Sequence, residues 1–543
     1  MTDLIQLSSL EKILPQSDCN LESIKQITVL HGEEASYQIA FKENHKTEVN
    51  IKIISDIDSF VTVYSVGCVP VMLPTYESAL DDPDYISTEP SIYPDILMPV
   101  ENGKTEANGW YQSIWIKVDK NVPVGLHNIT VELTTAEEKK CCELVYEVLP
   151  IELPDSDLIF TQWFHTDCIS SYYNVPVWSE KHWELIEKFI HTAVKNGINM
   201  ILTPVFTPPL DTEVGGERPT VQLVKIIKEC EKYSFDFSLL ERWVKLCIES
   251  GVKYFEISHL FTQWGAKYTP KIVATEDGEE KRIFGWDVNA DDERYENFLS
   301  QFLPALIAFF EKKNLLQNTY FHISDEPSEQ HSSDYLKAKN IAVKYLKDCH
   351  IIDALSDYNF YKTGIVELPV VAIDSINPFI GNIDELWGYY CCAQCNGVSN
   401  RFIAMPSSRN RFIALQMYKY KLKGFLQWGY NFYYKQYSKG MINPFFQNDS
   451  GGAFPAGDPF SVYPGENGPV ESLRLVVFHH ALQDLAAFKL LESLIGYDET
   501  LSIIENVAGD VVFDKCTSDS KVVLKTRELI NNKLKEILCG SAK

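Results

Sequence analysis

The order of short apolar runs and longer helical segments is the feature that most narrows the fold of this chain. Eight apolar runs lie between residues 158 and 429, and most are followed by a segment with the period of an amphipathic helix. This alternation is typical of parallel strands joined by crossover helices. Eight such units predict a (β/α)8 barrel, the TIM barrel. The runs are residues 158–165, 198–204, 253–259, 318–324, 351–357, 370–374, 386–391 and 424–429.

The chain before the barrel has a different pattern. Residues 1–152 contain short alternating segments separated by Gly, Pro, Asn and Asp, which predicts an N-terminal β-sandwich. The segments are residues 35–42, 49–55, 61–69, 112–119, 127–135 and 142–150. We expect the barrel to span residues 153–495 and residues 496–543 to form a charged tail with one amphipathic helix. A length of 543 residues fits several units, because one hydrophobic core rarely serves so long a chain.

The net charge of the chain limits the classes of partner that it can bind. Lys and Arg number 49 and Asp and Glu number 75, which gives a formal net charge of −26. Such a charge repels nucleic-acid phosphates and anionic lipids, so we expect neither nucleic acid nor a membrane as a partner. The first residues lack a basic segment followed by an apolar one, so we expect a cytoplasmic location. A homo-oligomer is compatible with these features.

The cysteines favour reduced thiols, because their number, 13, is odd and they are spread through the sequence rather than spaced like the disulfide framework of a small secreted domain. Cys391, Cys392 and Cys395 are closely spaced, but no second Cys or His pair follows at the spacing that a structural zinc site requires. We therefore expect no metal and no cofactor.

Two adjacent carboxylates follow the fourth run. Asp325 and Glu326 come directly after it, and Pro327 ends the strand. Neighbours in a regular strand point to opposite faces, so both acids reach one ligand only where the strand gives way to a turn. Two acids so close do not ionise independently, and one can keep its proton near neutral pH. Barrel enzymes react at these strand ends, so we expect a catalytic pair; the alternative is that the acids cap the next helix.

Polar and aromatic residues near other run ends are candidates for substrate binding. Aromatic rings can stack on the C–H faces of a sugar, and polar side chains can hydrogen-bond its oxygen atoms. Each candidate has packing at the barrel mouth as its alternative. The candidates are Trp264 and Trp428 for stacking, and Tyr358, Tyr389, Asp211, His259, Asn359 and Asn431 for hydrogen bonds. We expect Arg401, Arg409 and Arg411 to lie on solvated helix faces rather than to bind an acidic sugar.

Several longer motifs carry a family resemblance. FHISDEPSE (321–329), SHLFTQWGAKYTPKI (258–272) and GAFPAGDPFSVYPG (452–465) resemble bacterial proteins grouped around family 123 of the glycoside hydrolases, and the likeness spans about residues 155–490. Known members of that family are β-N-acetylgalactosaminidases that use an Asp-Glu pair in substrate-assisted catalysis.

The resemblance implies a retaining, exo-acting hydrolase that removes a β-linked 2-acetamido sugar from a small glycan or glycoside, with N-acetylgalactosamine favoured. In this mechanism Glu326 is the acid and base, and Asp325 orients the acetamido N–H. We expect Tyr358, Tyr389 or Tyr433 to hydrogen-bond the acetamido carbonyl.

Two alternatives to this mechanism stay open. One is an ordinary two-carboxylate glycosidase in which Glu326 works with Glu256, Asp167 or Asp357. The other is a barrel that binds glycans without hydrolysing them.

Overall fold

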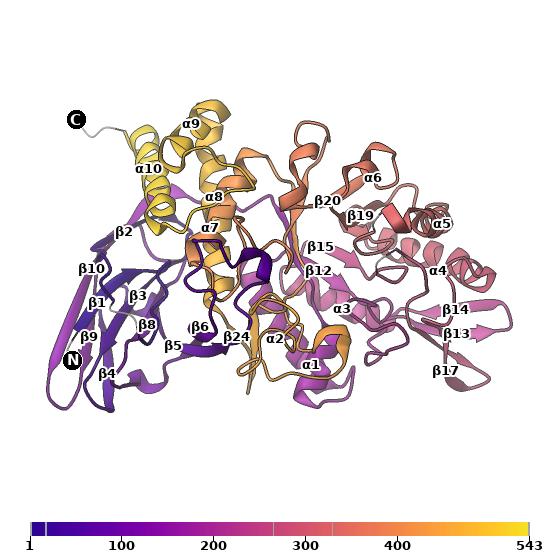
Figure 1. Cartoon of the computed structure of the whole chain (residues 1–543), viewed down its shortest axis with the longest axis horizontal. Helices are drawn as coiled ribbons and strands as arrows, with labels where there is room; N and C mark the ends of the chain where they lie inside the picture. Colours follow the sequence, from indigo (N-terminus) through magenta and orange to yellow (C-terminus); the bar gives the residue numbers. More distant parts are fainter. Residues whose placement is uncertain (1–2, 17–18, 264, 328, 541–543) are drawn as a thin grey trace.

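The computed structural model describes residues 3–16, 19–263, 265–327 and 329–540. A β-sandwich at one end packs against a closed barrel, and the C-terminal helices lie over the junction between them (Figure 1). None of the described helices combines the length and the apolar character needed to cross a bilayer.

The N-terminal region contains two five-stranded sheets. Their facing side chains form a hydrophobic cluster that includes the fully buried Tyr37, Ile39, Ile116 and Val131. Six of the ten strands follow the alternating segments seen in the sequence, whereas β1, β2, β6 and β7 were not predicted. In order across each sheet, the strands are β1 (Asp3–Ser8), β3 (Ala35–Lys42), β8 (Gln112–Val118), β5 (Val61–Val71) and β6 (Ser91–Pro99), then β2 (Gln26–His31), β10 (Lys139–Glu152), β9 (Gly125–Thr134), β4 (Thr47–Ile54) and β7 (Lys104–Ala107).

Eight parallel strands close into a barrel, and each overlaps one of the eight predicted runs, which confirms the TIM-barrel prediction. The first and last strands pair along four residues, with Phe160 opposite Phe425. The strands are β11 (Ile159–Gln162), β12 (Met200–Thr203), β15 (Tyr254–Ile257), β18 (Thr319–Phe321), β19 (His350–Leu355), β20 (Leu368–Ala372), β21 (Trp387–Tyr389) and β22 (Gly424–Gln427).

Amphipathic helices cover the barrel, and capping side chains explain where two of them begin. Ser179 accepts a hydrogen bond from the backbone of His182 at the start of α2, and Asp292 does so from Arg294 at the start of α4. The connection from β20 to β21 contains two short 3-10 turns in place of a long helix. The helices are α1 (Thr166–Tyr173), α2 (Glu180–Lys195), α3 (Ser238–Glu249), α4 (Glu293–Lys312), α5 (Ser332–Ala342), α6 (Tyr358–Lys362), α7 (Ser407–Lys419) and α8 (Leu473–Ile495).

A four-stranded sheet that was not predicted is inserted into the loops after β12 and β15. It lies at the end of the molecule opposite the sandwich (Figure 1). The hairpin between its last two strands turns at Asp277 and Gly278, whose φ angles are 55° and 81°. Asp-Gly at such a turn is a strong hairpin signal. The strands are β13 (Lys225–Glu229), β14 (Lys232–Asp236), β16 (Ile272–Glu276) and β17 (Glu279–Phe284).

Two helices follow the barrel, α9 (Tyr497–Ala508) and α10 (Ser520–Leu538). In α10, Arg527 forms ion pairs with Glu33 of the sandwich at 2.5 Å and with Asp484 of α8 at 2.9 Å. Asn531 donates a hydrogen bond to the carbonyl of Thr28 at 2.8 Å. Helix α10 therefore ties the sandwich to the helical layer of the barrel.

The sandwich and the barrel share one hydrophobic cluster. Val69, Tyr93 and Trp115 of the sandwich belong to the same buried cluster as Phe160 and Phe189 of the barrel region. A buried ion pair crosses the same boundary, because both oxygens of Asp95 accept hydrogen bonds of 2.9 Å from Arg474 in α8.

The expectation of solvated arginines is wrong. Arg401, Arg409 and Arg411 are all buried. Arg409 and Arg411 lie in α7, which packs against α8 and α10, whereas Arg401 precedes that helix. Arg409 pairs with Asp82 at 2.8 Å and Arg411 with Asp484 at 2.7 Å. Arg401 donates to Gln162, which ends the first barrel strand.

Candidate active site

The acid pair follows β18 at the carboxyl end of the barrel strands. The strand ends at Phe321, and Asp325 and Glu326 come four and five residues later. The φ angle of Glu326 is 43°, in the left-handed region, so the backbone turns sharply here, as two adjacent acids facing one ligand require. Both residues are half-buried.

The two carboxyls perturb each other. Burial and then the neighbouring Glu326 raise the pKa of Asp325 well above its ordinary value. Burial also raises the pKa of Glu326, while the Tyr389 hydroxyl, which donates to Glu326 Oε1 at 2.6 Å, lowers it. The described residues offer no hydrogen bond to the Asp325 carboxyl. One proton can therefore be shared near neutral pH, and in the free protein the Tyr389 contact favours keeping it on Asp325.

A buried charged network lies beneath the pair. His322 Nε2 lies 2.7 Å from Glu256, and its Nδ1 lies 3.4 Å from Asp353. Glu256 also accepts hydrogen bonds of 2.7 Å from Thr161 and from Trp163. Burial opposes a charge on His322, but the two carboxylates outweigh it and raise the pKa of His322 to about 9. The positive charge of this imidazolium in turn lowers the pKa of Asp325.

His259, a candidate hydroxyl ligand, is part of the packing under this network. Its ring stacks on that of His322 with centroids 4.3 Å apart, and only 1% of the residue is exposed. Burial lowers its pKa well below the ordinary value, so it is a neutral ring against a cation. This position does not favour direct contact with a sugar.

Trp428 and Tyr389 lie at the ends of neighbouring strands and contact the same hydrophobic cluster inside the barrel. Trp428 is half-exposed, as a stacking surface must be, and its indole N–H donates to Asp458 at 2.8 Å. Asp458 is fully buried, and burial raises its pKa to about 7. Sequence reasoning missed Asp458 because it lies some thirty residues beyond the last strand, in a loop rich in Gly and Pro.

The other candidates lie in structural positions or at the rim. Asn431 is fully buried and exchanges two hydrogen bonds with the backbone of His165, so it holds two loops together rather than facing a ligand. Tyr358 is half-buried against Phe379, and Asn359 is exposed in the first turn of α6. Trp264 lies outside the described residues.

Asp211 connects two loops through hydrogen bonds. Its carboxylate accepts a hydrogen bond from the backbone of Tyr437 at 3.0 Å, and its own backbone carbonyl accepts one from Ser438 at 2.7 Å. Burial raises its pKa to about 6. This residue therefore positions residues 436–438 at the rim instead of presenting a free carboxylate.

The three carboxylates considered as alternative partners of Glu326 are engaged elsewhere. Glu256 belongs to the buried network under the pair. Asp167 is buried and receives two hydrogen bonds, of 2.8 and 2.7 Å, from Arg218. Asp357 caps α6 by accepting a hydrogen bond from the backbone of Asn359 at 2.8 Å. Within the described part of the chain, no group of three His, Cys, Asp or Glu side chains is arranged to hold a metal ion.

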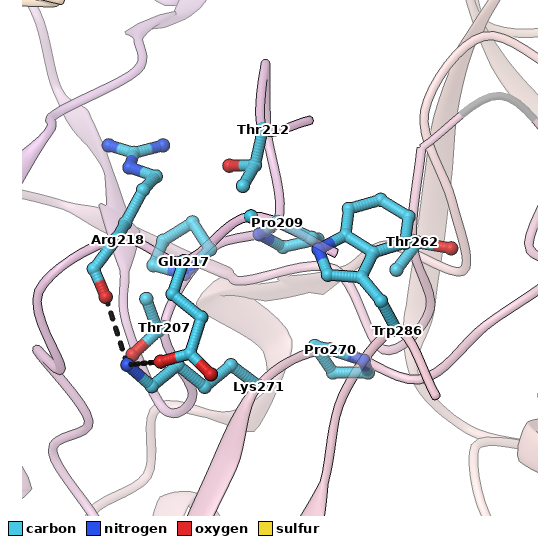
Figure 2. Close-up of a pocket in the computed structure, with 11 residues that line it drawn as sticks. Thr207, Pro209, Thr212, Glu217, Arg218, Thr262, Pro270, Lys271 and Trp286 are labelled. Atoms are coloured by element: carbon cyan, nitrogen blue, oxygen red, sulfur yellow. Dashed lines mark hydrogen bonds and ion pairs between the residues drawn. The ribbon is translucent and has the colours of Figure 1, made fainter. Parts of the chain in front are cut away.

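A small pocket, shown in Figure 2, lies among the loops that follow the barrel strands. Its volume is about 20 Å³, and it is lined by residues of the loops after β12 and β15, among them Pro209, Glu217 and Lys271, and by Trp286. Neither acid of the pair lines it. The carboxylates, not the size of a cavity, define where bond cleavage is possible, so we place the candidate active site at the pair and regard this pocket as its neighbour.

A barrel with a carboxylate pair at a strand end is a common architecture among glycoside hydrolases. The model of the family "Glycoside hydrolase 123, catalytic domain" matches residues 163–491, well over half of the chain. The protein belongs to glycoside hydrolase family 123, which confirms the resemblance seen in its motifs.

Solved structures agree at the level of the fold. A family 123 glycoside hydrolase from Clostridium perfringens, whose structure was reported for the details of glycolipid glycan hydrolysis, has a TM-score of 0.73 at 16% identity and covers 98% of this chain and 97% of its own. A β-glucuronidase from Parabacteroides merdae has a TM-score of 0.30 at 10% identity, with 83% and 51% of the two chains covered, too low to carry an argument. A search of curated proteins found no match.

Proposed function

We propose that this family 123 hydrolase is a retaining, exo-acting β-N-acetylhexosaminidase, with N-acetylgalactosamine as the favoured sugar, that uses substrate-assisted catalysis. The observation that carries the proposal is the pair itself: Glu326 is held by Tyr389 beside Asp325, while Glu256, Asp167 and Asp357 are engaged elsewhere. With those three carboxylates occupied, the acetamido oxygen of the substrate is the natural nucleophile.

The reaction has two steps. Glu326 gives its proton to the glycosidic oxygen as the bond from that oxygen to the anomeric carbon breaks. Asp325 accepts a hydrogen bond from the acetamido N–H, and the acetamido carbonyl oxygen forms a bond to the anomeric carbon, which gives an oxazolinium. Water then loses a proton to Glu326 and adds to the anomeric carbon, and the ring opens. Two inversions give net retention.

Substrate binding places the proton where the first step needs it. In the free protein the Tyr389 hydrogen bond stabilises the Glu326 anion and leaves the shared proton on Asp325. An acetamido N–H that donates to Asp325 stabilises the Asp325 anion instead. The proton then moves to Glu326, next to the leaving oxygen. A substrate without the acetamido group does not trigger this transfer.

Trp428 supplies the stacking surface for the terminal sugar in this proposal, since its half-exposed ring is fixed by the hydrogen bond to Asp458. The Clostridium perfringens relative was described for glycolipid glycan hydrolysis. We therefore propose the glycan part of a glycolipid as the natural class of substrate.

The first experiment compares aryl β-N-acetylgalactosaminide, aryl β-N-acetylglucosaminide and aryl β-galactoside. We expect the two acetamido sugars to be hydrolysed, the first one faster, and the plain galactoside to be left intact. Faster hydrolysis of the galactoside would contradict substrate assistance. Binding of these sugars without turnover would instead support a non-catalytic barrel.

Two variants separate the roles of the pair. Glu326→Gln should lose roughly 10²–10⁴-fold in kcat on a glycoside with a poor leaving group but much less on a dinitrophenyl glycoside, which needs little acid assistance. Asp325→Asn should lose activity on both, because it orients the nucleophile. If Asp325→Asn were fully active while folded Glu256→Gln was inactive, the two-carboxylate mechanism would replace this one.

A further inference from the structure

The pocket in Figure 2 opens at the same end of the barrel as the acid pair. Its walls come from the loops after β12 and β15, with Trp286 following β17. Loops that follow barrel strands lie at the carboxyl end of the barrel, where substrates bind. An adjoining hollow of about 190 Å³ shares Glu217 and Trp286 with this pocket and extends to Arg282 and Asp287, so it is the part of this surface with room for a sugar ring.

The wall of this pocket is bonded directly to the catalytic segment. Thr262 lines the pocket, and its carbonyl accepts a hydrogen bond of 2.8 Å from the hydroxyl of Ser324, the residue before Asp325. The preceding Phe261 donates from its backbone to the carbonyl of Ile323 at 3.0 Å. The pocket is therefore the immediate neighbour of the site proposed for the terminal sugar.

The lining combines an aromatic ring with hydrogen-bonding groups. Figure 2 shows Trp286 on one side, the ion pair of Glu217 and Lys271 on the other, and Pro209 between them. Glu217 and Lys271 are 2.7 Å apart, and Lys271 also donates to the carbonyl of Arg218 at 3.1 Å. A ring for C–H faces and nearby polar groups for hydroxyls form the kind of surface that binds a sugar.

The charges of the lining balance one another. Arg282 lies 3.4 Å from Glu217 and 2.6 Å from Asp287, and Arg218 pairs with Asp167 at 2.7 Å, so all three cations of the pocket and the hollow are already matched by carboxylates. A free phosphate or another strong anion would have to break these pairs. A neutral sugar can accept and donate hydrogen bonds without disturbing them.

The ring of Trp286 is held in place without a ligand. The hydroxyl of Thr269 bonds both the backbone N–H and the carbonyl of Gly285, at 2.9 and 3.0 Å, and so fixes the turn before Trp286. Tyr268 packs its edge against the indole with centroids 6.0 Å apart. A preformed surface loses little side-chain freedom on binding.

From these observations we infer that the hollow beside Trp286, which adjoins the pocket in Figure 2, is a subsite for a neutral sugar residue of the leaving-group glycan. The inference rests on the proposed function, because it takes the acid pair as the point of cleavage. It makes the enzyme selective for an oligosaccharide over a simple glycoside, with the terminal sugar at Trp428 and a later residue at Trp286.

The test compares Trp286→Ala with wild type on two substrates: an aryl β-N-acetylgalactosaminide, and a neutral trisaccharide that ends in β-N-acetylgalactosamine. We expect kcat/KM for the trisaccharide to fall roughly tenfold and the value for the aryl glycoside to stay unchanged. Trp110→Ala is the matched control, because Trp110 is exposed on the sandwich, far from the barrel mouth. Glu217→Gln, which keeps the shape of the pocket, should show a smaller loss on the trisaccharide alone.

Other outcomes of this experiment would reject either the subsite or the proposed function. Equal losses on both substrates, or none on either in folded Trp286→Ala, would overturn the subsite. If wild type hydrolysed neither substrate, the proposed function would fail, and the subsite would be judged by calorimetric binding of the trisaccharide to Glu326→Gln with and without Trp286→Ala. Equal binding to the two proteins would reject it.

Discussion

At the residue scale, the Tyr389 hydroxyl controls how Glu326 titrates. Its hydrogen bond lowers the pKa of Glu326, so removing it must raise that pKa. Because the shared proton of the free protein lies on Asp325, Glu326 is the carboxyl that titrates at the lower pH, so the acid limb of kcat/KM in Tyr389→Phe should move up by roughly 0.5–1 pH unit. Tyr358→Phe is the control, and its profile should match wild type. A downward movement in Tyr389→Phe would contradict the assignment.

The protonation of His322 makes the free energy of unfolding depend on pH. Its pKa is raised from 6.5 to about 9 in the folded protein, so its stabilising effect is complete below about pH 6.5 and is lost as pH rises through 9. His322→Gln leaves the buried Glu256 and Asp353 without their cation, and it should cost roughly 3 kcal/mol of unfolding free energy at pH 6. Urea unfolding at several pH values measures this.

The same variant tests the electrostatic link to the active site. Loss of the imidazolium raises the pKa of Asp325, the carboxyl that holds the shared proton in the free protein, so the alkaline limb of kcat/KM should move to higher pH. A purely structural role would lower stability without moving that limb. His31→Gln is the control, since that ring pairs with Glu152 at the surface and its loss should alter neither property.

At the scale of elements, the barrel strands could be predicted because each is an apolar run bounded by helical segments. The inserted sheet was missed because β13, β14, β16 and β17 lie within loops, although the Asp277-Gly278 turn was a usable signal. The acid pair was visible because its two members are adjacent in sequence. The roles of Asp353, Arg218 and Asp458 could not be predicted, because their hydrogen-bond partners are distant in sequence and come close only in the folded protein.

Helix α10 should contribute strongly to stability through Arg527. Removing this buried cation in Arg527→Met leaves Glu33 without its charged partner and Asp484 with only Arg411. We expect a loss of roughly 3 kcal/mol, measured as a lower melting temperature. Lys521→Ala in the same helix is the control and should leave the melting temperature unchanged, because Lys521 pairs with Glu22 at the exposed surface. Equal effects would show that the buried pair is unimportant.

At the scale of the whole molecule, the shared hydrophobic cluster and the Asp95–Arg474 pair couple the sandwich to the barrel. Separate units with a small polar interface would unfold independently. We therefore expect one calorimetric transition for the full chain, with equal calorimetric and van't Hoff enthalpies. Two resolved transitions would mean that the shared cluster does not couple the units.

The left-handed backbone conformation at Glu326 lowers the stability of the folded protein, while the Glu326 side chain is needed for the proposed activity. An L-residue with a long side chain is disfavoured in this conformation by about 1 kcal/mol, whereas Gly or Asn adopts it readily. Replacing Glu326 by Asn also removes a half-buried acid, so this variant should melt at a higher temperature than wild type. Selection for thermal stability alone would therefore favour replacing Glu326, which is the proposed proton donor. A glutamate at this position instead indicates selection for catalytic turnover.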